Sequence, residues 1–319
     1  MNNEMYNPLR PNSFDEFIGQ EKIINNLKVY IKAANIKDTS LDHTLLIGHA
    51  GVGKTSLAYI IAKELKQSIV VINANAIEKP KDIIIALSKL NEGDILFIDE
   101  IHALNKNCEE VLYSAMEDFY INLNVKNNLK REIMKYELPP FTLIGATTNV
   151  EEISKPLLDR FSITLNLLSY TYSDISKILL NISKRLEYNY EKEALNKISS
   201  VSRLIPRIAI NYLKRINDYA LADNIKFISK DYVIKVLNNL GINKYGLNNL
   251  DIRYLKMLHK AYNDKPVGIN TITSYLNENQ KTIEETVEKY LIEIAFIKKT
   301  SKGRIITKKG ITYLNNLYK

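Results

Sequence analysis

The loop GHAGVGKTS, residues 48–56, constrains the fold of this chain more than any other stretch. It follows an apolar run, precedes a helical pattern and fits G-x-x-x-x-G-K-S/T at Gly48, Gly53, Lys54 and Thr55. Glycines let such a loop curl so that backbone N–H groups point at phosphate, and the helix N-terminus adds positive potential. A glycine-rich turn that matches by chance is the less favoured interpretation in this strand–loop–helix context.

The loop therefore predicts a site for a nucleoside triphosphate and Mg²⁺. Lys54 would reach the outer phosphates, and the hydroxyl of Thr55 would contact Mg²⁺. The residues expected to contact the nucleotide here are Gly48, Gly51, Val52, Gly53, Lys54, Thr55 and Ser56.

Short apolar runs recur through the first half of the chain, separated by helical patterns. They are HTLLIG, SIVVINA, DILFIDE, FTLIGATT and ITLNLL. Each run is nearly continuous rather than alternating, as expected for strands that are covered on both faces. One intervening stretch places Cys108, Val111, Leu112, Ala115, Met116 and Phe119 on one helix face. The pattern over 1–167 predicts an α/β domain, a parallel sheet with helices on both faces.

The remaining sequence predicts two further domains. Consecutive helical patterns fill 171–240 without strands, and GINKYGLNN is a plausible linker. Three short helical patterns then precede AFIKKTSKGRIITKKG, which we interpret as two strands with a turn near Gly303. Helices followed by a basic hairpin outline a winged-helix domain. The expected domains are an ATPase domain at 1–167, a small helical domain at 168–244 and a winged-helix domain at 245–319.

Composition excludes several classes of protein. The chain has 319 residues, and no apolar run approaches the about 18 residues of a membrane span. One cysteine, Cys108, cannot form an internal disulfide, and the N-terminal sequence does not resemble a secretion signal, so we expect a cytoplasmic protein. The four histidines show no metal-ligand spacing. The net charge of +8 suits a polyanionic partner. The basic hairpin segment either contacts that partner or is a solvated tail.

The segment ILFIDEIH, residues 95–102, supplies acidic partners for the loop. Four apolar residues would carry a buried strand to its carboxyl end, where ligands bind in open α/β sheets. Asp99 would hold Mg²⁺ through water, and Glu100 would polarise the attacking water. Alone, a strand that ends in Asp-Glu is more often an edge or a helix cap, but its pairing with the loop favours catalysis.

Seven segments in order resemble one known family, the RuvB family of AAA+ motors for Holliday-junction branch migration in bacteria. They are LRPNSFDEFIGQ, GHAGVGKT, AIEKP, FIDEIHALN, VLYSAMEDF, LPPFTLIGATT and PLLDRF. PRIAINYLKRINDYA resembles the lid domain of that family, and PVGINTI, TIEETVEKYLIEIAFI and KTSKGR resemble its winged helix. The resemblance covers nearly the whole chain.

The resemblance implies roles for individual residues. Thr148 matches the sensor beside the γ-phosphate, and Arg160 matches the arginine finger that reaches a neighbouring subunit's nucleotide. Arg207 matches the second sensor, carried on the lid. The positions around the adenine of ATP correspond to Leu9, Arg10, Ile18, Tyr170 and Pro206. A finger that acts in trans implies a ring, which in this family is a homo-hexamer.

The resemblance also implies partners. The segment 120–137 corresponds to the hairpin that docks RuvA, with a plain surface hairpin as the alternative, and RuvC is a further expected partner. Lys299, Lys302 and Arg304 would contact duplex DNA through the wing without reading sequence. Three departures from the family are His49 and Ala50 for the usual prolines, KNNLKRE at the hairpin tip, and lysines for wing arginines.

Two rival functions remain open at this point. A sequence-specific regulator with an ATP switch would read bases through the helix at 282–294, but Glu284, Glu285, Glu288 and Glu293 would face phosphate repulsion there. A clamp-loader ATPase would carry a helical collar rather than a basic wing. We therefore predict an ATP-dependent DNA translocase that drives branch migration of Holliday junctions in recombination and repair.

Overall fold

The computed structural model describes residues 8–127 and 130–317 and separates into two compact units. The first unit runs to Leu186 and includes Ile205–Arg207, and the second comprises Glu187–Leu204 and the chain from Ile208 onward. The predicted fold class, an α/β domain with a helical domain and a winged helix, is confirmed. The boundaries between the three expected domains remain a prediction.

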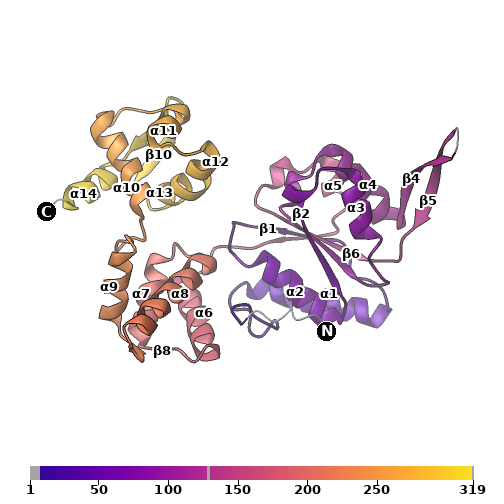
Figure 1. Ribbon diagram of the computed structural model, residues 1–319, viewed down its shortest axis with the longest axis horizontal. Helices are drawn as coiled ribbons and strands as arrows, with labels where there is room; N and C mark the ends of the chain where they lie inside the picture. The colour runs from indigo at the N-terminus through magenta and orange to yellow at the C-terminus, as the bar shows by residue number, and fades with distance from the viewer. Residues whose placement is uncertain (1–7, 128–129, 318–319) are drawn as a thin grey trace. The chain divides into compact units, whose positions relative to one another are not determined.

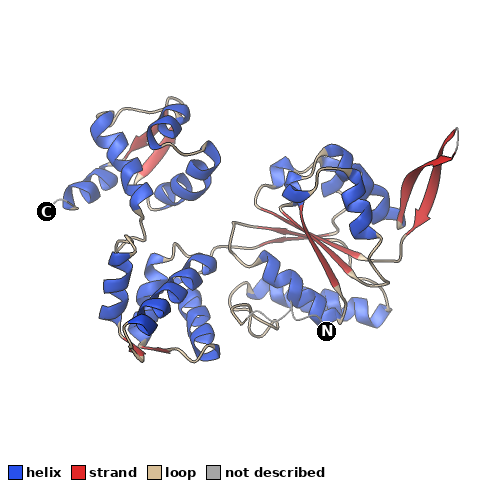
Figure 2. Ribbon diagram, viewed as in Figure 1, coloured by secondary structure: helices blue, strands red, loops and turns tan. Residues whose placement is uncertain are grey.

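A five-stranded sheet forms the centre of the first unit (Figures 1 and 2). The strand order is β2-β3-β6-β1-β7, and every neighbouring pair is parallel. The strands are β1 (Thr44–Ile47), β2 (Ile69–Asn73), β3 (Ile95–Asp99), β6 (Thr142–Thr147) and β7 (Ile163–Asn166). All five apolar runs thus form strands, and the central β1, β3 and β6 are the most buried.

Helices cover both faces of this sheet. In Figure 1 α1 (Glu21–Lys37) and α2 (Lys54–Leu65) lie on one face, and α3 (Pro80–Leu87), α4 (Lys106–Asp118) and α5 (Lys155–Leu158) lie on the other. Helix α6 (Tyr172–Arg185) follows. Short 3-10 turns at Ala74–Ala76, Ile101–Ala103 and Val150–Glu152 come after strands β2, β3 and β6.

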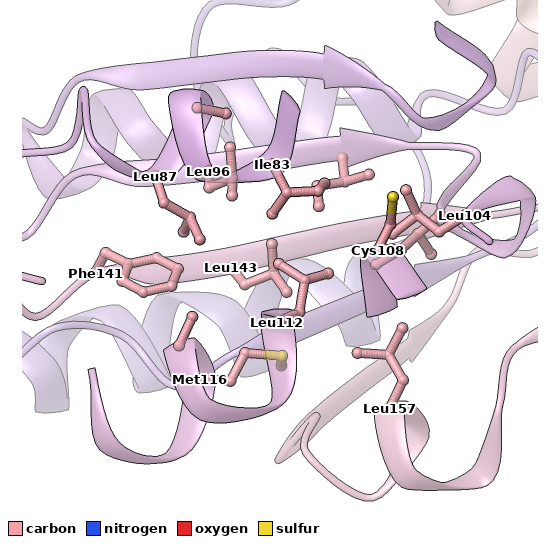
Figure 3. Close-up of a cluster of buried hydrophobic side chains, with 14 of the residues drawn as sticks. Ile83, Leu87, Leu96, Leu104, Cys108, Leu112, Met116, Phe141, Leu143 and Leu157 are labelled. Carbon is pink, nitrogen blue, oxygen red and sulfur yellow. The ribbon is translucent and has the colours of Figure 1, made fainter. Parts of the chain in front are cut away.

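The apolar face predicted for α4 packs into the main core of this unit. Cys108, Leu112 and Met116 are buried there beside Leu143 and Phe141 (Figure 3). Ala115 is buried as well, and Val111 and Phe119 pack against the cluster. Asn105 starts the helix because its side chain accepts a hydrogen bond from the Cys108 backbone N–H at 3.1 Å. Each fully buried leucine in such a core contributes roughly 1.5–3 kcal/mol.

A separate hairpin follows α4. Strands β4 (Tyr120–Asn127) and β5 (Lys130–Glu137) pair antiparallel over eight residues each. Figure 1 shows the hairpin extending away from the sheet. Residues 128 and 129 of the expected docking tip at 126–132 lie outside the described residues.

The helical part of the second unit contains α7 (Lys192–Val201), most of α8 (Pro206–Ala222) and α9 (Lys230–Asn239). The prediction that 171–240 has no strands is wrong. Strands β8 (Asn189–Tyr190) and β9 (Phe227–Ile228) form a short parallel pair. Two-residue strands leave no apolar run that a sequence pattern could reveal.

The C-terminal part of this unit has the winged-helix arrangement. Its helices are α10 (Asn249–Lys256), α11 (Ile269–Leu276), α12 (Gln280–Thr282), α13 (Lys289–Glu293) and α14 (Lys308–Asn316). Segments Met257–Ala261 and Ile283–Glu288 are π-helical, and the second makes α12 and α13 one continuous helix. The wing is β10 (Ile297–Thr300) and β11 (Gly303–Ile306), as predicted, whereas α14 was not predicted.

One ion pair ties the end of α7 to the winged helix. Arg203 donates to Asp251, to the Gly246 carbonyl at 3.0 Å and to the Thr286 carbonyl at 3.0 Å. Its guanidinium also lies 4.6 Å from the ring centroid of Tyr290. The side chain of Asp251 is fully buried, so this pair joins the two parts of the unit inside a dry contact.

Across the described residues, no helix has both the length and the apolar character of a membrane span.

Candidate functional site

The phosphate loop connects β1 to α2 at the carboxyl edge of the sheet. Lys54, the first residue of α2, is buried, and its ammonium donates to the Gly48 carbonyl at 2.7 Å and to the His49 carbonyl at 3.2 Å. Thr55 and Ser56 follow it half-buried in the first turn of α2, and their phosphate contacts remain a prediction.

Glycine is required within the loop at position 51. Gly51 has φ +82°, and a Cβ there would lie 2.8 Å from Cβ of Arg207. The Arg207 backbone N–H donates to the Gly51 carbonyl at 3.4 Å. The structure therefore brings the expected second sensor directly against the phosphate loop.

Asp99 ends β3 beside the loop. Burial, followed by the carboxylate of Glu100, raises the pKa of Asp99, whereas Lys54 and Arg207 act to lower it. Its Oδ1 accepts the backbone N–H of Glu100 at 3.1 Å. Lys54 and Arg207 are thus the two cations whose charges act on this carboxyl.

Glu100 leaves the strand in a left-handed conformation with φ +52°. A regular strand would direct adjacent side chains to opposite faces, and this turn redirects Glu100. The Thr148 hydroxyl, just after β6, donates to Glu100 Oε2 at 3.2 Å. The proposed base and the proposed sensor are thus in direct contact.

His102 belongs to the same cluster, although the sequence predicted no role for it beyond a spacing that argues against a metal site. Its Nδ1 lies 3.4 Å from Glu100 Oε2 and 2.9 Å from the Thr147 hydroxyl. Thr147 also accepts the Asn149 backbone N–H at 2.9 Å. The signal was available in the sequence, because both residues flank the expected catalytic positions in DEIH and ATT.

The residues expected around the adenine occupy three segments of the first unit. The buried Tyr170 donates its hydroxyl to the Val52 carbonyl at 2.8 Å, and burial raises its pKa. Arg10 lies over the Tyr59 ring of α2 at 5.1 Å. Leu9 and Ile18, which are close to Arg10 in the sequence, are half-buried. Pro206, the first residue of α8, is buried.

Two unpredicted residues support this side of the loop. The side-chain amide nitrogen of Gln20 donates to the Leu168 carbonyl at 2.7 Å, and the side-chain amide oxygen of Gln20 accepts the Leu168 backbone N–H at 3.0 Å. Phe17 lies against Gly53, where a Cβ would be 3.1 Å from the phenyl ring. Gln20 thus fixes the N-terminal segment against the chain that follows β7, and Phe17 packs the same segment against the phosphate loop.

Arg160 is held by α4 and α5. Its guanidinium donates to Glu117 Oε2 at 2.8 Å, to the Pro156 carbonyl at 2.7 Å and to the Tyr113 carbonyl at 3.3 Å. It also lies 4.6 Å from the Tyr113 ring centroid. Glu117 and Tyr113 were not predicted to contact it.

The donor set suits Mg²⁺. Thr55 and Asp99 offer hard oxygen atoms, and Mg²⁺ usually keeps several waters when proteins bind it. Within the described chain no group of three or more His, Cys, Asp or Glu could hold a metal ion. A metal at this site would therefore rely on few protein ligands together with phosphate and water.

The wing residues differ in their surroundings. Lys302 is exposed at the β10–β11 turn, whereas Lys299 lies 3.0 Å from Glu288 and Arg304 contacts Glu288 and Glu284 at 2.8 and 2.7 Å. Glu284 and Glu288 therefore face the wing rather than an open helix surface. For these two acids, the repulsion argument against a base-reading helix does not hold, and only Glu285 and Glu293 still support it.

Family models match the chain in three consecutive parts. The descriptions are Holliday junction DNA helicase RuvB P-loop domain for residues 9–167, RuvB AAA lid domain for 170–243 and RuvB C-terminal winged helix domain for 244–315.

Individual relatives agree with these models. The Holliday junction branch migration complex subunit RuvB of Ehrlichia ruminantium (strain Gardel) is 44% identical over 307 residues, covering 96% of this chain and 92% of the relative. The same-named subunit of Mesomycoplasma hyopneumoniae (strain 7448) is 43% identical, covering 97% of both. A solved structure, the Thermotoga maritima RuvB Holliday junction branch migration motor, superposes with a TM-score of 0.86 at 39% identity, covering 97% of this chain and 99% of that one. The chain belongs to the RuvB family.

Proposed function

We propose that this chain is an ATP-hydrolysing motor that moves duplex DNA and so drives branch migration of Holliday junctions in recombination and repair. One observation carries the proposal. In a member of the RuvB family, the adjacent parallel strands β3, β6 and β1 end in the acid pair Asp99–Glu100, in Thr148 and in a phosphate loop with Lys54, and Thr148 donates to Glu100.

The site residues have distinct tasks in this proposal. Backbone N–H groups of the loop and Lys54 bind the phosphates, and Glu100 takes up the proton of the attacking water. Thr148 orients the Glu100 carboxylate through the hydrogen bond of 3.2 Å. Thr55 and Asp99 would hold Mg²⁺, which supplies charge neutralisation at the phosphates when it is bound.

Two arginines would complete the cycle. Arg160 would reach the nucleotide of the next subunit, which requires a ring, and we propose a homo-hexamer. Arg207 lies at the start of α8 against Gly51, so a change at the phosphates could be passed along this helix to the lid. A permanently charged, planar guanidinium suits both tasks because it can bind phosphate oxygens in pairs.

The DNA and the partners are assigned by the same proposal. The wing residues Lys299, Lys302 and Arg304 would contact the backbone of duplex DNA without sequence preference. The hairpin β4–β5 would dock RuvA, and RuvC would join the same complex. A DNA motor of this kind would act in the cytoplasm.

The decisive experiment is dissociation of a synthetic four-way junction with ATP and Mg²⁺, with and without RuvA from the same organism. Glu100→Gln is the control because it keeps shape and hydrogen bonding but removes the base. We expect junction loss with the wild-type chain only, strengthened by RuvA.

Hydrolysis without junction loss, even with RuvA and an assembled ring, would contradict the motor. It would favour a clamp-loader or regulatory ATPase. A dominant sequence preference in a DNA selection experiment would favour the regulator specifically.

A further inference from the structure

A fully buried carboxylate lies between the wing and the helix that precedes it. Glu288 Oε1 accepts hydrogen bonds from the Tyr254 hydroxyl at 2.9 Å and from Arg304 Nε at 2.8 Å. Its Oε2 lies 3.0 Å from the ammonium of Lys299. Glu284, one turn earlier and partly exposed, accepts a hydrogen bond from Arg304 Nη2 at 2.7 Å.

Within this cluster Glu288 is charged although its side chain is fully buried. Burial opposes ionisation of Glu288, but hydrogen bonds from Arg304, Lys299 and Tyr254 outweigh burial and lower its pKa. Replacing one member of a buried ion pair leaves its partner uncompensated, so such a pair fixes geometry strongly. The acids therefore determine where the two basic side chains of the wing lie.

The backbone of Arg304 is fixed as well. Its N–H and carbonyl each pair with Val267 at 2.8 Å, and Gly303 permits this approach because a Cβ there would be 2.4 Å from the Val267 carbonyl. A guanidinium has five N–H donors in a rigid fork. Nε and Nη2 are bound to the two acids, and among the described residues Nη1 of Arg304 makes no hydrogen bond.

We propose that Glu284 and Glu288 are positioning residues for DNA, which hold Arg304 and Lys299 so that their remaining donors meet a backbone phosphate. This inference rests on the proposed function of the wing. Orientation in advance reduces the entropy lost when a long side chain binds. Acidic residues beside a DNA contact would then strengthen DNA binding, whereas simple charge repulsion predicts that they weaken it.

The direction in which DNA affinity changes when a carboxylate is removed therefore tests the proposal. Without positioning, removing any carboxylate near a polyanion should tighten binding. Glu285 is the matched control, because it lies on the same helix and, among the residues that the structure describes, pairs only with Lys281, at 4.0 Å. Glu284 is a better target than Glu288, since its side chain is 34% exposed and its loss should not unfold the domain.

The experiment measures the affinity of the full chain for a fluorescent duplex of arbitrary sequence over a range of salt concentrations. We expect Glu285→Gln to bind as tightly as wild type or more tightly, and Glu284→Gln to bind about fivefold more weakly, which corresponds to the net contribution of one average hydrogen bond. Arg304→Gln should reduce the slope of log affinity against log salt by about 0.9 per lost phosphate contact.

A double variant separates positioning from a general structural role. In an Arg304→Gln background, Glu284→Gln should no longer weaken binding, because the acid acts through that arginine. Tighter binding by Glu284→Gln alone, equal to that of Glu285→Gln, would overturn this inference and leave the DNA role intact. A wild-type chain without salt-dependent duplex binding would instead refute the proposed DNA role, and the inference with it.

Discussion

The Arg203–Asp251 pair makes a quantitative prediction about the second unit. Asp251 is fully buried and Arg203 is 8% exposed, so Arg203→Met would leave a carboxylate without its counter-charge. Removing one partner of a buried pair costs about 3–5 kcal/mol. Arg203 also satisfies the carbonyls of Gly246 and Thr286, which supports the upper part of this range.

Hydrogen exchange of the full chain, read by mass spectrometry on peptides from 244–315, measures this cost where it arises. We expect protection in these peptides to fall by roughly two to four orders of magnitude, because 1.4 kcal/mol corresponds to tenfold. Arg215→Met is the control. Arg215 pairs with Asp218 on the surface with side chains 61% and 54% exposed, so its loss should change protection by about twofold at most.

The pH dependence provides a second readout. Burial raises the pKa of Asp251, and Arg203 acts in the opposite direction. A raised pKa means that the folded state binds this proton more readily, so the cost of burying the charge applies at neutral pH and is relieved as pH falls. The penalty of Arg203→Met should therefore shrink on acidification. Protection close to wild type at neutral pH, or a penalty that grows in acid, would refute this account.

Three further outcomes test the nucleotide site. Gly51→Ala should weaken nucleotide affinity at least about tenfold, because the new Cβ would lie 2.8 Å from Arg207. Gly268→Ala is the control and should bind nucleotide normally, because no atom lies within 4 Å of its added Cβ. Titration with a fluorescent nucleotide measures both affinities. In the same titration Tyr170→Phe should lose up to about tenfold by leaving the Val52 carbonyl unpaired, and unchanged affinity would contradict that. Arg160→Ala and a base-dead variant, Glu100→Gln, should each hydrolyse ATP about 10³-fold more slowly, yet an equimolar mixture should recover about a quarter of the wild-type rate if the finger acts in trans. No recovery in assembled rings would rule out the trans role.

Local patterns predicted the parts of the fold that repeat one signal over several residues. All five core strands arise from continuous apolar runs, and α4 follows from an apolar face that begins after Asn105. The phosphate loop and the acid pair were predictable because phosphate chemistry restricts both residue type and spacing. The winged helix followed from the basic hairpin and the helices before it.

Long-range contacts explain what the sequence could not indicate. His102 reaches Glu100 only because a left-handed turn and the next strand bring Thr147 alongside it. The acids of the helix at 282–294 were expected to face phosphate repulsion if that helix read bases, but the wing folds back and binds Glu284 and Glu288. Such pairings depend on tertiary position, to which neither hydrophobic period nor net charge is sensitive.

The positive φ of Glu100 affects how loss-of-function variants at this position should be interpreted. Left-handed geometry is tolerated by glycine and asparagine but strains β-branched residues by about 1–2 kcal/mol or more. A glycine variant would therefore remove the carboxylate and keep the path of the chain. A valine variant would remove the carboxylate and also displace Asp99 and the turn, so genetic screens that group the two would confuse a missing base with a misdirected backbone.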